Sequence, residues 1–331
     1  MKTSKILMTL MSLTTFCLTS CSKGVHHPYS DYFLEVPYKS NFKVLQLTDI
    51  HLSAKDDCDL HFKFMDLTIK EANADFIMVT GDLFTFATVS TMESLFNFLD
   101  SYKTPWGVTF GNHDEQIYFA MSYMTERLSK DYKYCKFIDY QDDDIFGYAN
   151  YCINLKNGDD VKYQLYVFDS NRYYYGDYIG YDYIHEDQIN WYEGMVNYSR
   201  ENFGNGKVVP SLGFFHIPLE EYKTAYALYE EGSSEVIYKY GKNNEGVSNA
   251  KHNSGLFDKI VSLDSTKAIF VGHDHINNSQ IEYKGVDLVY GIHSTDRIYG
   301  REDMMGGLTI TIHDDNSYSI DRIYHTYEEV K

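Results

Sequence analysis

The amino-acid sequence predicts an α/β protein in which one large domain spans residues 41–331. Short apolar runs of strand length recur from residue 42 onward, helix-like segments lie between several of them, and hairpin patterns interrupt the alternation. No Pro- or Ser-rich linker and no fixed-period repeat divides this stretch of sequence, so one domain is favoured over two. With 44% hydrophobic and 23% charged residues, the chain has the composition of a globular protein that buries a core.

The expected strands are apolar runs that end in a polar or glycine-containing turn. They cover residues 43–48, 76–80, 106–110, 208–215 and 268–271. Met92, Leu95, Phe96 and Leu99 recur at three- and four-residue spacing, which predicts a helix with one core-facing stripe. Further helices are expected near residues 62–69, 186–202 and 220–231.

Hairpin patterns make the expected sheets mixed rather than purely parallel. Two of them are centred on Asn157-Gly158 and Lys284-Gly285, sequences that favour tight turns between alternating runs. The paired runs are 151–155 with 162–168, 279–283 with 286–290, and 308–312 with 318–323.

The N-terminal segment predicts export and lipid attachment. Lys2 and Lys5 flank the start of an apolar run of about 13 residues, which is too short for a spanning helix of roughly 20. The Leu-Thr-Ser-Cys sequence ending at Cys21 resembles a bacterial lipobox, so residues 1–20 are interpreted as a lipoprotein signal peptide and Cys21 as the lipidated first residue. Residues 21–40 are expected to tether an extracytoplasmic domain to a membrane of the bacterial cell envelope. An ordinary secretory peptide that ends near a cysteine is the alternative.

The charge balance constrains the ligands of the domain. With 29 Lys and Arg against 48 Asp and Glu, the formal net charge is −19, which disfavours binding to long nucleic acids. Bound divalent cations would make a crevice locally positive even in an acidic protein. A small phosphate ester therefore remains compatible with this composition.

Polar residues follow five of the expected strands at the point where each strand ends. They supply three carboxylates, one amide and five histidines: Asp49, His51, Asp82, Asn112, His113, Asp114, His216, His273 and His275. Because the carboxyl ends of strands in open α/β sheets meet at one crevice, we expect these side chains to converge. Mixed carboxylate and imidazole donors suit Mn, Fe or Zn, and a cluster this rich can hold two divalent or trivalent ions.

The order of these blocks resembles that of a known family. Asp-x-His, Gly-Asp, Gly-Asn-His-Asp, His and Gly-His-x-His follow one another as in the calcineurin-like metallophosphoesterases, over residues 42–325. The segments 213–219 and 253–258 are similar to a narrower branch, the purple-acid-phosphatase-related proteins, which often carry the label "probable inactive". No ligand position is vacant in this sequence, which argues against inactivity. The resemblance implies a four-layer α-β-β-α sandwich of two mixed sheets flanked by helices.

The resemblance also implies a binuclear centre in which a metal-bound hydroxide attacks phosphorus. Asp82 would bridge the two ions. The remaining ligands would be Asp49, His51 and His275 on the first ion, and Asn112, His216 and His273 on the second.

His113 and Asp114 are the catalytic candidates that the resemblance implies outside the ligand set. His113 would stabilise charge or protonate the leaving oxygen, and Asp114 would orient its imidazole. One departure concerns Thr85, which stands where true purple acid phosphatases carry a tyrosine three residues after the Gly-Asp aspartate. Their first block also has Gly where this chain has His51. The sequence therefore predicts a colourless enzyme.

Other polar and aromatic residues are assigned ordinary roles. Arg172 is interpreted as part of a solvated turn, His252 as a residue preceding a helix, and His293 as a secondary candidate for the substrate crevice. The 32 tyrosines and 20 phenylalanines are spread along the chain, so packing is favoured over a stacking platform even for the clusters at 173–175 and 178–183.

The favoured function is hydrolysis of a phosphomonoester or small phosphodiester. One alternative is a cyclic-nucleotide phosphodiesterase or nuclease on the same site. The other is a metal-bearing binding or scaffold protein without turnover, which would have no need of His113 beside a complete ligand set.

Overall fold

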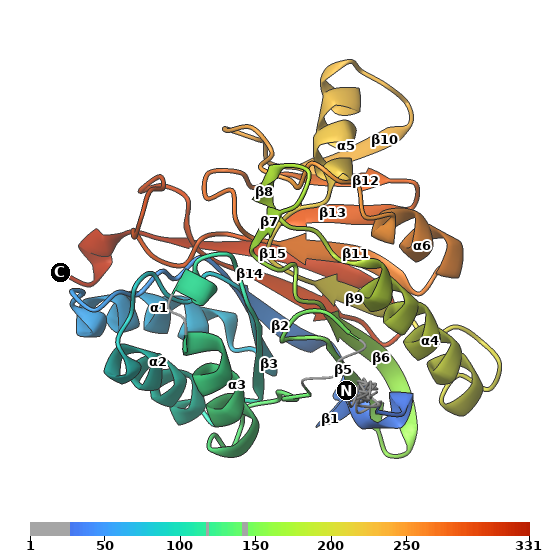
Figure 1. Ribbon diagram of the computed structural model, residues 1–331, viewed down its shortest axis with the longest axis horizontal. Coiled ribbons are helices and arrows are strands. Elements are labelled where there is room, and N and C mark those ends of the chain that lie inside the picture. The colour runs from blue at the N-terminus through green and yellow to red at the C-terminus, as the bar shows by residue number, and fades with distance from the viewer. Residues whose placement is uncertain (1–26, 117–118, 141–144) are drawn as a thin grey trace, which may run out of the picture.

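The computed structural model describes residues 27–116, 119–140 and 145–331 (Figure 1). The expected signal peptide at 1–20 and the expected lipidation site Cys21 lie outside these residues. Within the described ranges, no helix combines the length and the apolar character that crossing a membrane requires.

Two mixed sheets form the centre of the molecule (Figure 1). The larger sheet has eight strands in the order β1 (Phe33–Pro37), β5 (Tyr151–Asn157), β6 (Asp160–Val167), β9 (Ser211–Phe214), β11 (Thr266–Val271), β13 (Val286–Tyr290), β12 (Gln280–Tyr283) and β10 (Val236–Tyr240). The smaller sheet has five strands in the order β15 (Tyr318–His325), β14 (Met305–Ile312), β2 (Phe42–Leu47), β3 (Phe76–Thr80) and β4 (Trp106–Thr109). A separate hairpin pairs β7 (Tyr173–Tyr175) with β8 (Ile179–Tyr181).

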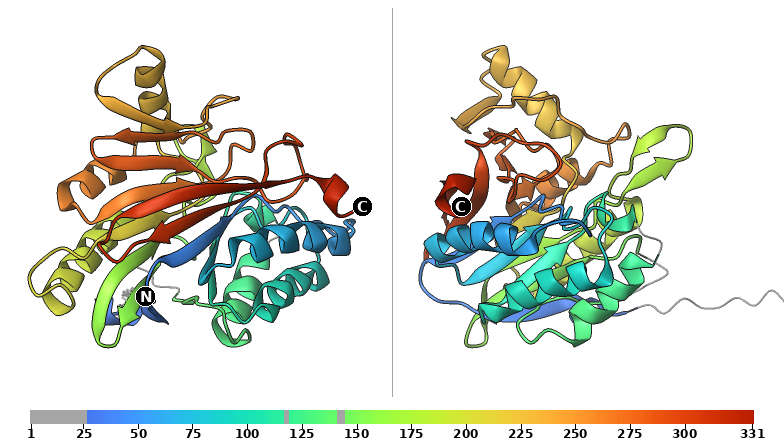
Figure 2. Two further views of the ribbon diagram at one scale, coloured as in Figure 1. Left: turned by 180° about the vertical axis from the view of Figure 1, so that it is seen from behind. Right: turned by 90° about the vertical axis from the view of Figure 1, so that its left-hand side faces the viewer.

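Helices form the outer layers (Figure 1, Figure 2). The five-stranded sheet is covered by α1 (Cys58–Ala72), α2 (Val89–Ser101) and α3 (Ala120–Lys130). The eight-stranded sheet is covered by α4 (Glu186–Asn202) and α6 (Leu256–Leu263), while α5 (Glu220–Glu230) stands at its β10 edge. The predicted four-layer α-β-β-α architecture is thereby confirmed.

Period-two alternation sends neighbouring side chains of a central strand into different cores. In β11, Ala268 and Phe270 join the apolar cluster between the sheets, which also contains Leu45 of β2. Ile269 and Val271 point the other way, into the cluster that packs against α4 and α6. A strand buried on both faces in this way reads as a continuous apolar run, which is why β11 was recognisable from sequence.

Parallel pairing places the functional strand ends on one rim. β2 pairs in parallel with β3 and β3 with β4 in one sheet, while β9 pairs in parallel with β11 in the other. All five strands therefore deliver their carboxyl-terminal loops to the same end of the sandwich.

The prediction that residues 21–40 form a tether is wrong for the second half of this range, which contains the strand β1. β1 pairs in parallel with β5 from Phe33 opposite Cys152 to Pro37 opposite Lys156. Val36 is buried in the core, so this segment is an integral edge strand and the domain begins before residue 41. The partner strand lies far along the chain, which is why no local pattern disclosed the pairing.

The three predicted hairpins are confirmed as the antiparallel pairs β5–β6, β12–β13 and β14–β15. The run expected at 208–215 is shorter, because β9 begins after Pro210, which has no N–H for a ladder. The strands β7, β8 and β10 were not predicted. Cys58, Cys135 and Cys152 are free thiols, so no disulfide joins these three cysteines.

Candidate metal centre

The loops that follow β2, β3, β4, β9 and β11 bring six of the seven predicted ligands together with His113. Their ligand atoms form three overlapping groups, each within 4.8 Å: Asp49 with His51 and His275, His51 with Asp82 and His113, and Asp82 with His216 and His273. Residues separated by more than half of the chain thus meet at one point, as the strand-end argument predicted.

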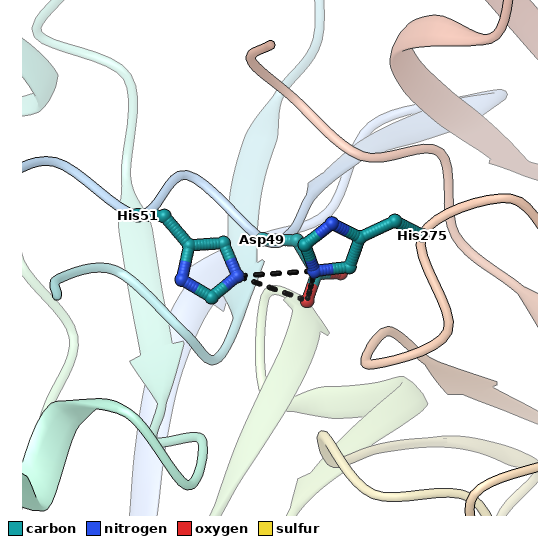
Figure 3. Close-up of side chains that lie close together, drawn as sticks. All are labelled: Asp49, His51 and His275. Carbon is teal, nitrogen blue, oxygen red and sulfur yellow. Dashed lines mark hydrogen bonds and ion pairs between the residues drawn. The ribbon is translucent and has the colours of Figure 1, made fainter. Parts of the chain in front are cut away.

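The first group presents its donor atoms to a common point (Figure 3). His51 Nε2 lies 3.1 Å from His275 Nε2, and Asp49 Oδ1 lies 3.4 Å from His275 Nε2 and 3.9 Å from His51 Nε2. His275 Nδ1 contacts the Tyr299 carbonyl at 2.7 Å, and a carbonyl can only accept, so Nδ1 carries the proton. The Nε2 lone pair of His275 is therefore free for a metal ion.

The second group repeats this logic. His216 Nδ1 contacts the Thr80 carbonyl at 2.8 Å, so Nδ1 carries a proton, and Nε2 faces Asp82 Oδ2 at 3.1 Å, where it would offer a lone pair to an ion once its own proton is displaced. Asn112 Oδ1 and His273 Nε2 are buried and make no hydrogen bond with the described residues. Buried polar atoms without partners are costly, so their clustering fits a site built for cations. The residues present therefore fit two metal ions.

The backbone around the ligands is unusual. Four of the candidate ligands have a left-handed backbone, which non-glycine residues rarely adopt. The φ angle is 54° at Asp49, 51° at His51, 50° at Asp82 and 76° at His273. Such conformations cost about 1–3 kcal/mol each and persist where the surrounding structure enforces them. Here the left-handed turns redirect each side chain from its strand end into the crevice.

Glycines allow the strands to approach the ligands closely. A Cβ at Gly111 would lie 2.2 Å from Asp82 Oδ1, and one at Gly272 would lie 2.5 Å from Asp49 Oδ2. The Asp49 carboxylate is fixed by Thr48 Oγ1, which donates at 2.9 Å. Positions 111 and 272 therefore require glycine because a side chain would not fit, not because the backbone has a positive φ.

The electrostatics of the crevice favour ionised carboxylates. Burial alone would raise the pKa of Asp49 and of Asp82, but the surrounding imidazoles hold both well below the usual range. Burial lowers the pKa of His51 and of His273 to about 3, so both are neutral. For His216, the nearby carboxylates outweigh burial and raise the pKa to about 10. The crevice thus retains a proton at the place where a cation would displace it.

Comparisons with known proteins agree with this geometry. Residues 42–277 match the family model described as calcineurin-like phosphoesterase. This chain belongs to that family. It is 30% identical over 299 residues to "Probable inactive purple acid phosphatase 29" of Arabidopsis thaliana, covering 78% of this chain and 73% of that protein.

One further relative and one solved structure are similar to this chain. The chain is 26% identical to "Probable inactive purple acid phosphatase 14" of Arabidopsis thaliana, covering 85% of this chain and 77% of that protein. Among solved structures, a dimetal phosphatase from Danio rerio aligns with a TM-score of 0.54 at 12% identity, covering 83% of this chain and 94% of that chain. This structural likeness shows that the chain shares the fold of the Danio rerio dimetal phosphatase.

His113 lies beside the candidate ligands Asp82 and His51. Its backbone N–H donates to Asp82 Oδ1 at 2.8 Å, and its ring meets the His51 ring edge-on with centroids 4.9 Å apart. The side chain is only half-buried, so it faces the open part of the crevice.

The expected role of Asp114 requires correction. Its two carboxylate oxygens accept the backbone N–H groups of Phe84 and Gly111 at 3.0 and 2.8 Å, so they tie the loops after β3 and β4 together. The contact to the His113 imidazole comes instead from Gln116, whose side-chain nitrogen lies 2.7 Å from His113 Nδ1. The short 3₁₀ turn Asp114–Gln116 brings Gln116 back toward the imidazole. Sequence reasoning missed this residue because no motif marks it.

His275 also has partners that sequence reasoning missed. The Tyr299 ring stacks on it at 4.2 Å and 4°, and the His293 ring lies near-parallel at 5.5 Å. Glu245 accepts from the Tyr299 hydroxyl at 3.1 Å with each carboxylate oxygen and from Ile276 N at 3.1 Å. His293 thus lies beside the candidate ligand His275.

The other weaker candidates lie outside the three ligand groups. Arg172 Nη1 donates to the Glu115 carbonyl at 2.8 Å. His252 Nε2 lies 3.0 Å from Asp177 Oδ1 and packs among tyrosines of the 173–183 segment.

Proposed function

We propose that this protein is a metal-dependent hydrolase that cleaves a phosphomonoester or small phosphodiester at a binuclear centre. One observation carries the proposal: Asp82 Oδ2 lies 3.5 Å from His51 Nε2 and 3.1 Å from His216 Nε2, so one carboxylate faces both ligand groups. Asp82 would bridge two ions. Asp49, His51 and His275 would complete one ion, and Asn112, His216 and His273 the other. Mn, Fe and Zn match this mixture of donors.

When bound, such a pair of ions clamps a phosphate and supplies a nucleophile near neutral pH. The chain's own contribution is to fix the ligand directions through the Thr80 and Tyr299 carbonyls. His113 adds an imidazole nitrogen to the crevice, on a side chain that is only half-buried. Because Gln116 engages its Nδ1, the Nε2 of His113 is left to exchange a proton with the leaving oxygen.

The word "inactive" in the names of two relatives belongs to those proteins. In this chain, six of the seven proposed ligands fall within the three close groups, and the seventh, Asn112, has a buried oxygen without a partner. A complete and convergent ligand set with an adjacent half-buried histidine supports turnover over a scaffold role.

The test is hydrolysis of a broad panel of phosphomonoesters and phosphodiesters by protein loaded with Mn, Fe or Zn, with metal content measured on each sample. His113→Ala should keep its metal and lose about 100-fold or more in rate on alkyl esters, with a smaller loss on nitrophenyl esters. The matched control is His313→Ala, which removes a half-buried histidine that contacts Asn41 and Ser319. Full metal content without turnover of any panel member would overturn the proposal.

We also propose from the sequence that the mature protein is anchored through lipid on Cys21 in the cell envelope. The support is the lipobox-like sequence that ends at this residue. Cys21→Ser should move the protein from the membrane fraction to the soluble envelope fraction and abolish labelling by radioactive palmitate. Persistent labelling of the variant would refute the anchor.

A further inference from the structure

We infer that one face of the β7–β8 hairpin is the binding surface for a flat aromatic group on the substrate. This inference rests on the proposed phosphoesterase function and names a substrate class for it. The hairpin projects from the body of the molecule (Figure 2).

Strand alternation divides the hairpin into two different faces. Tyr173 pairs with Tyr181 and Tyr175 pairs with Ile179, so these four side chains share one face, which we call the outer aromatic face. Tyr174, which lies between Tyr173 and Tyr175 in sequence, points to the opposite face.

The opposite face is used for anchoring. Tyr174 packs against Tyr178 at 4.8 Å and Tyr183 at 5.8 Å, and its ring meets the His252 ring edge-on at 5.5 Å. His252 in turn contacts Asp177 in the turn of the hairpin at 3.0 Å. These contacts fix the orientation of the hairpin without using the outer aromatic face.

The outer aromatic face begins at a metal ligand. The Tyr181 ring lies 4.4 Å from the His273 ring at 88°, and Tyr173 stacks near-parallel on Tyr181 at 5.6 Å and 18°. Both tyrosines are half-buried. One pair further along the strands, about 7 Å away, Tyr175 is 72% exposed and Ile179 is 81% exposed. A continuous apolar surface therefore runs from the metal centre into solvent.

Continuity with the metal centre identifies the occupant. A phosphate held beside His273 places its organic group against Tyr181 and Tyr173, and a group separated from phosphorus by the length of a sugar ring reaches Tyr175. Tyrosine rings offer flat faces with polar edges, which favour stacking of a planar ring over coverage by a flexible chain. The Arg172 guanidinium, 5.5 Å from the Tyr173 ring, adds positive charge on this side. The substrate class is thus a phosphate ester with an aromatic group, either a nucleobase or a simple aryl ring.

The experiment compares substrate pairs that share a primary alkoxide leaving group and differ only in the distal group. The pairs are adenosine 5′-monophosphate with ribose 5-phosphate, and 2-phenylethyl phosphate with hexyl phosphate. We expect kcat/KM to favour the aromatic member of at least one pair by about tenfold, the order expected for stacking on one aromatic side chain. The first pair reports a nucleobase and the second a simple aryl group.

Two variants test the surface itself. Tyr175→Ser, which changes an exposed side chain, and Tyr181→Leu should each reduce the aromatic preference severalfold. The same loss should appear in the Kd of non-hydrolysable phosphonate analogues measured by calorimetry. Tyr229→Ser, at an exposed tyrosine of α5, is the control and should leave the preference unchanged. Metal content is measured for Tyr181→Leu because of its contact with His273.

The outcomes separate the two proposals. The aromatic surface is overturned, and the hydrolase proposal kept, if Tyr175→Ser turns over substrate with an unchanged aromatic preference. The same conclusion follows if the wild type shows no aromatic preference in either substrate pair. Absence of turnover on every substrate, with metals bound, instead removes the proposed function on which the inference rests.

Discussion

Replacing Gly272 with alanine should displace the proposed metal ligand Asp49 without disturbing the architecture. A Cβ at this position would lie 2.0 Å from Thr48 Oγ1 and 2.5 Å from Asp49 Oδ2, well inside an ordinary contact of roughly 3.5 Å. Gly272 does not have a left-handed φ, so the effect comes from crowding rather than from backbone strain.

The expected losses of stability and of metal affinity follow from the contacts of the crowded Asp49 carboxylate. Asp49 Oδ2 accepts from Thr48 Oγ1 at 2.9 Å and from His273 N at 3.1 Å, so moving the carboxylate disturbs both contacts. Overpacking of a buried site costs about 1–3 kcal/mol of folding free energy. Disturbing the partners of a metal ligand typically lowers metal affinity about 10- to 100-fold.

The assay is calorimetric titration of metal-free protein with Mn²⁺, combined with urea unfolding in EDTA. Gly246→Ala is the matched control, because a Cβ there meets no atom within 4 Å and its expected change in stability is below about 0.5 kcal/mol. Thr48→Val provides a second variant that removes the donor to Asp49 without adding volume. Wild-type Mn²⁺ affinity in Gly272→Ala would refute the assignment of Asp49 as a ligand in this geometry.

Three further predictions concern the metals, pH and colour. Removal of both ions by EDTA should lower the melting temperature, because ligand held at 100 times its Kd stabilises the folded state by about 2.7 kcal/mol per site; an unchanged melting temperature would contradict the site. Burial and the Asp169 carboxylate raise the pKa of Glu115 from 4.5 to about 7, so the folded state keeps a proton that the unfolded chain has lost, and stability falls as pH rises between these values. Glu115→Gln should therefore unfold in urea with about 2 kcal/mol more stability than wild type at pH 8, allowing for partial exposure, and with equal stability at pH 4. Iron-loaded protein should show no visible tyrosinate band in its absorption spectrum, because Thr85 lies 2.9 Å from His51 Nδ1 where a tyrosine ligand would be needed for colour.

Much of the fold was predictable because its signals are local. The apolar runs of β2, β3, β4 and β11 and the turn at Asn157-Gly158 each identify an element within a few residues. The strand β1 could not be found in this way, since its burial depends on a partner more than a hundred residues later. The β7–β8 hairpin was hidden for another reason, because its tyrosines resembled those spread over the rest of the sequence.

The convergence of the candidate ligands was also predictable, whereas the residues that support them were not. Carboxylate and imidazole side chains at five strand ends predict a metal site from residue type and position alone. The contacts of Gln116 with His113, and of Tyr299 with His275, depend on how two loops pack in space. The error about Asp114 has the same origin, since sequence proximity to His113 did not decide where its carboxylate points.

By itself, the sequence determined which side chains are able to hold metal ions, because donor chemistry resides in each residue. Only the tertiary structure decided which lone pairs face a common point. That direction depends on the left-handed backbone at Asp49 and Asp82 and on the carbonyls of Thr80 and Tyr299, which come from other segments of the chain. Packing of the two sheets fixes these partners, so the same packing that buries the core also directs the candidate ligands toward one point.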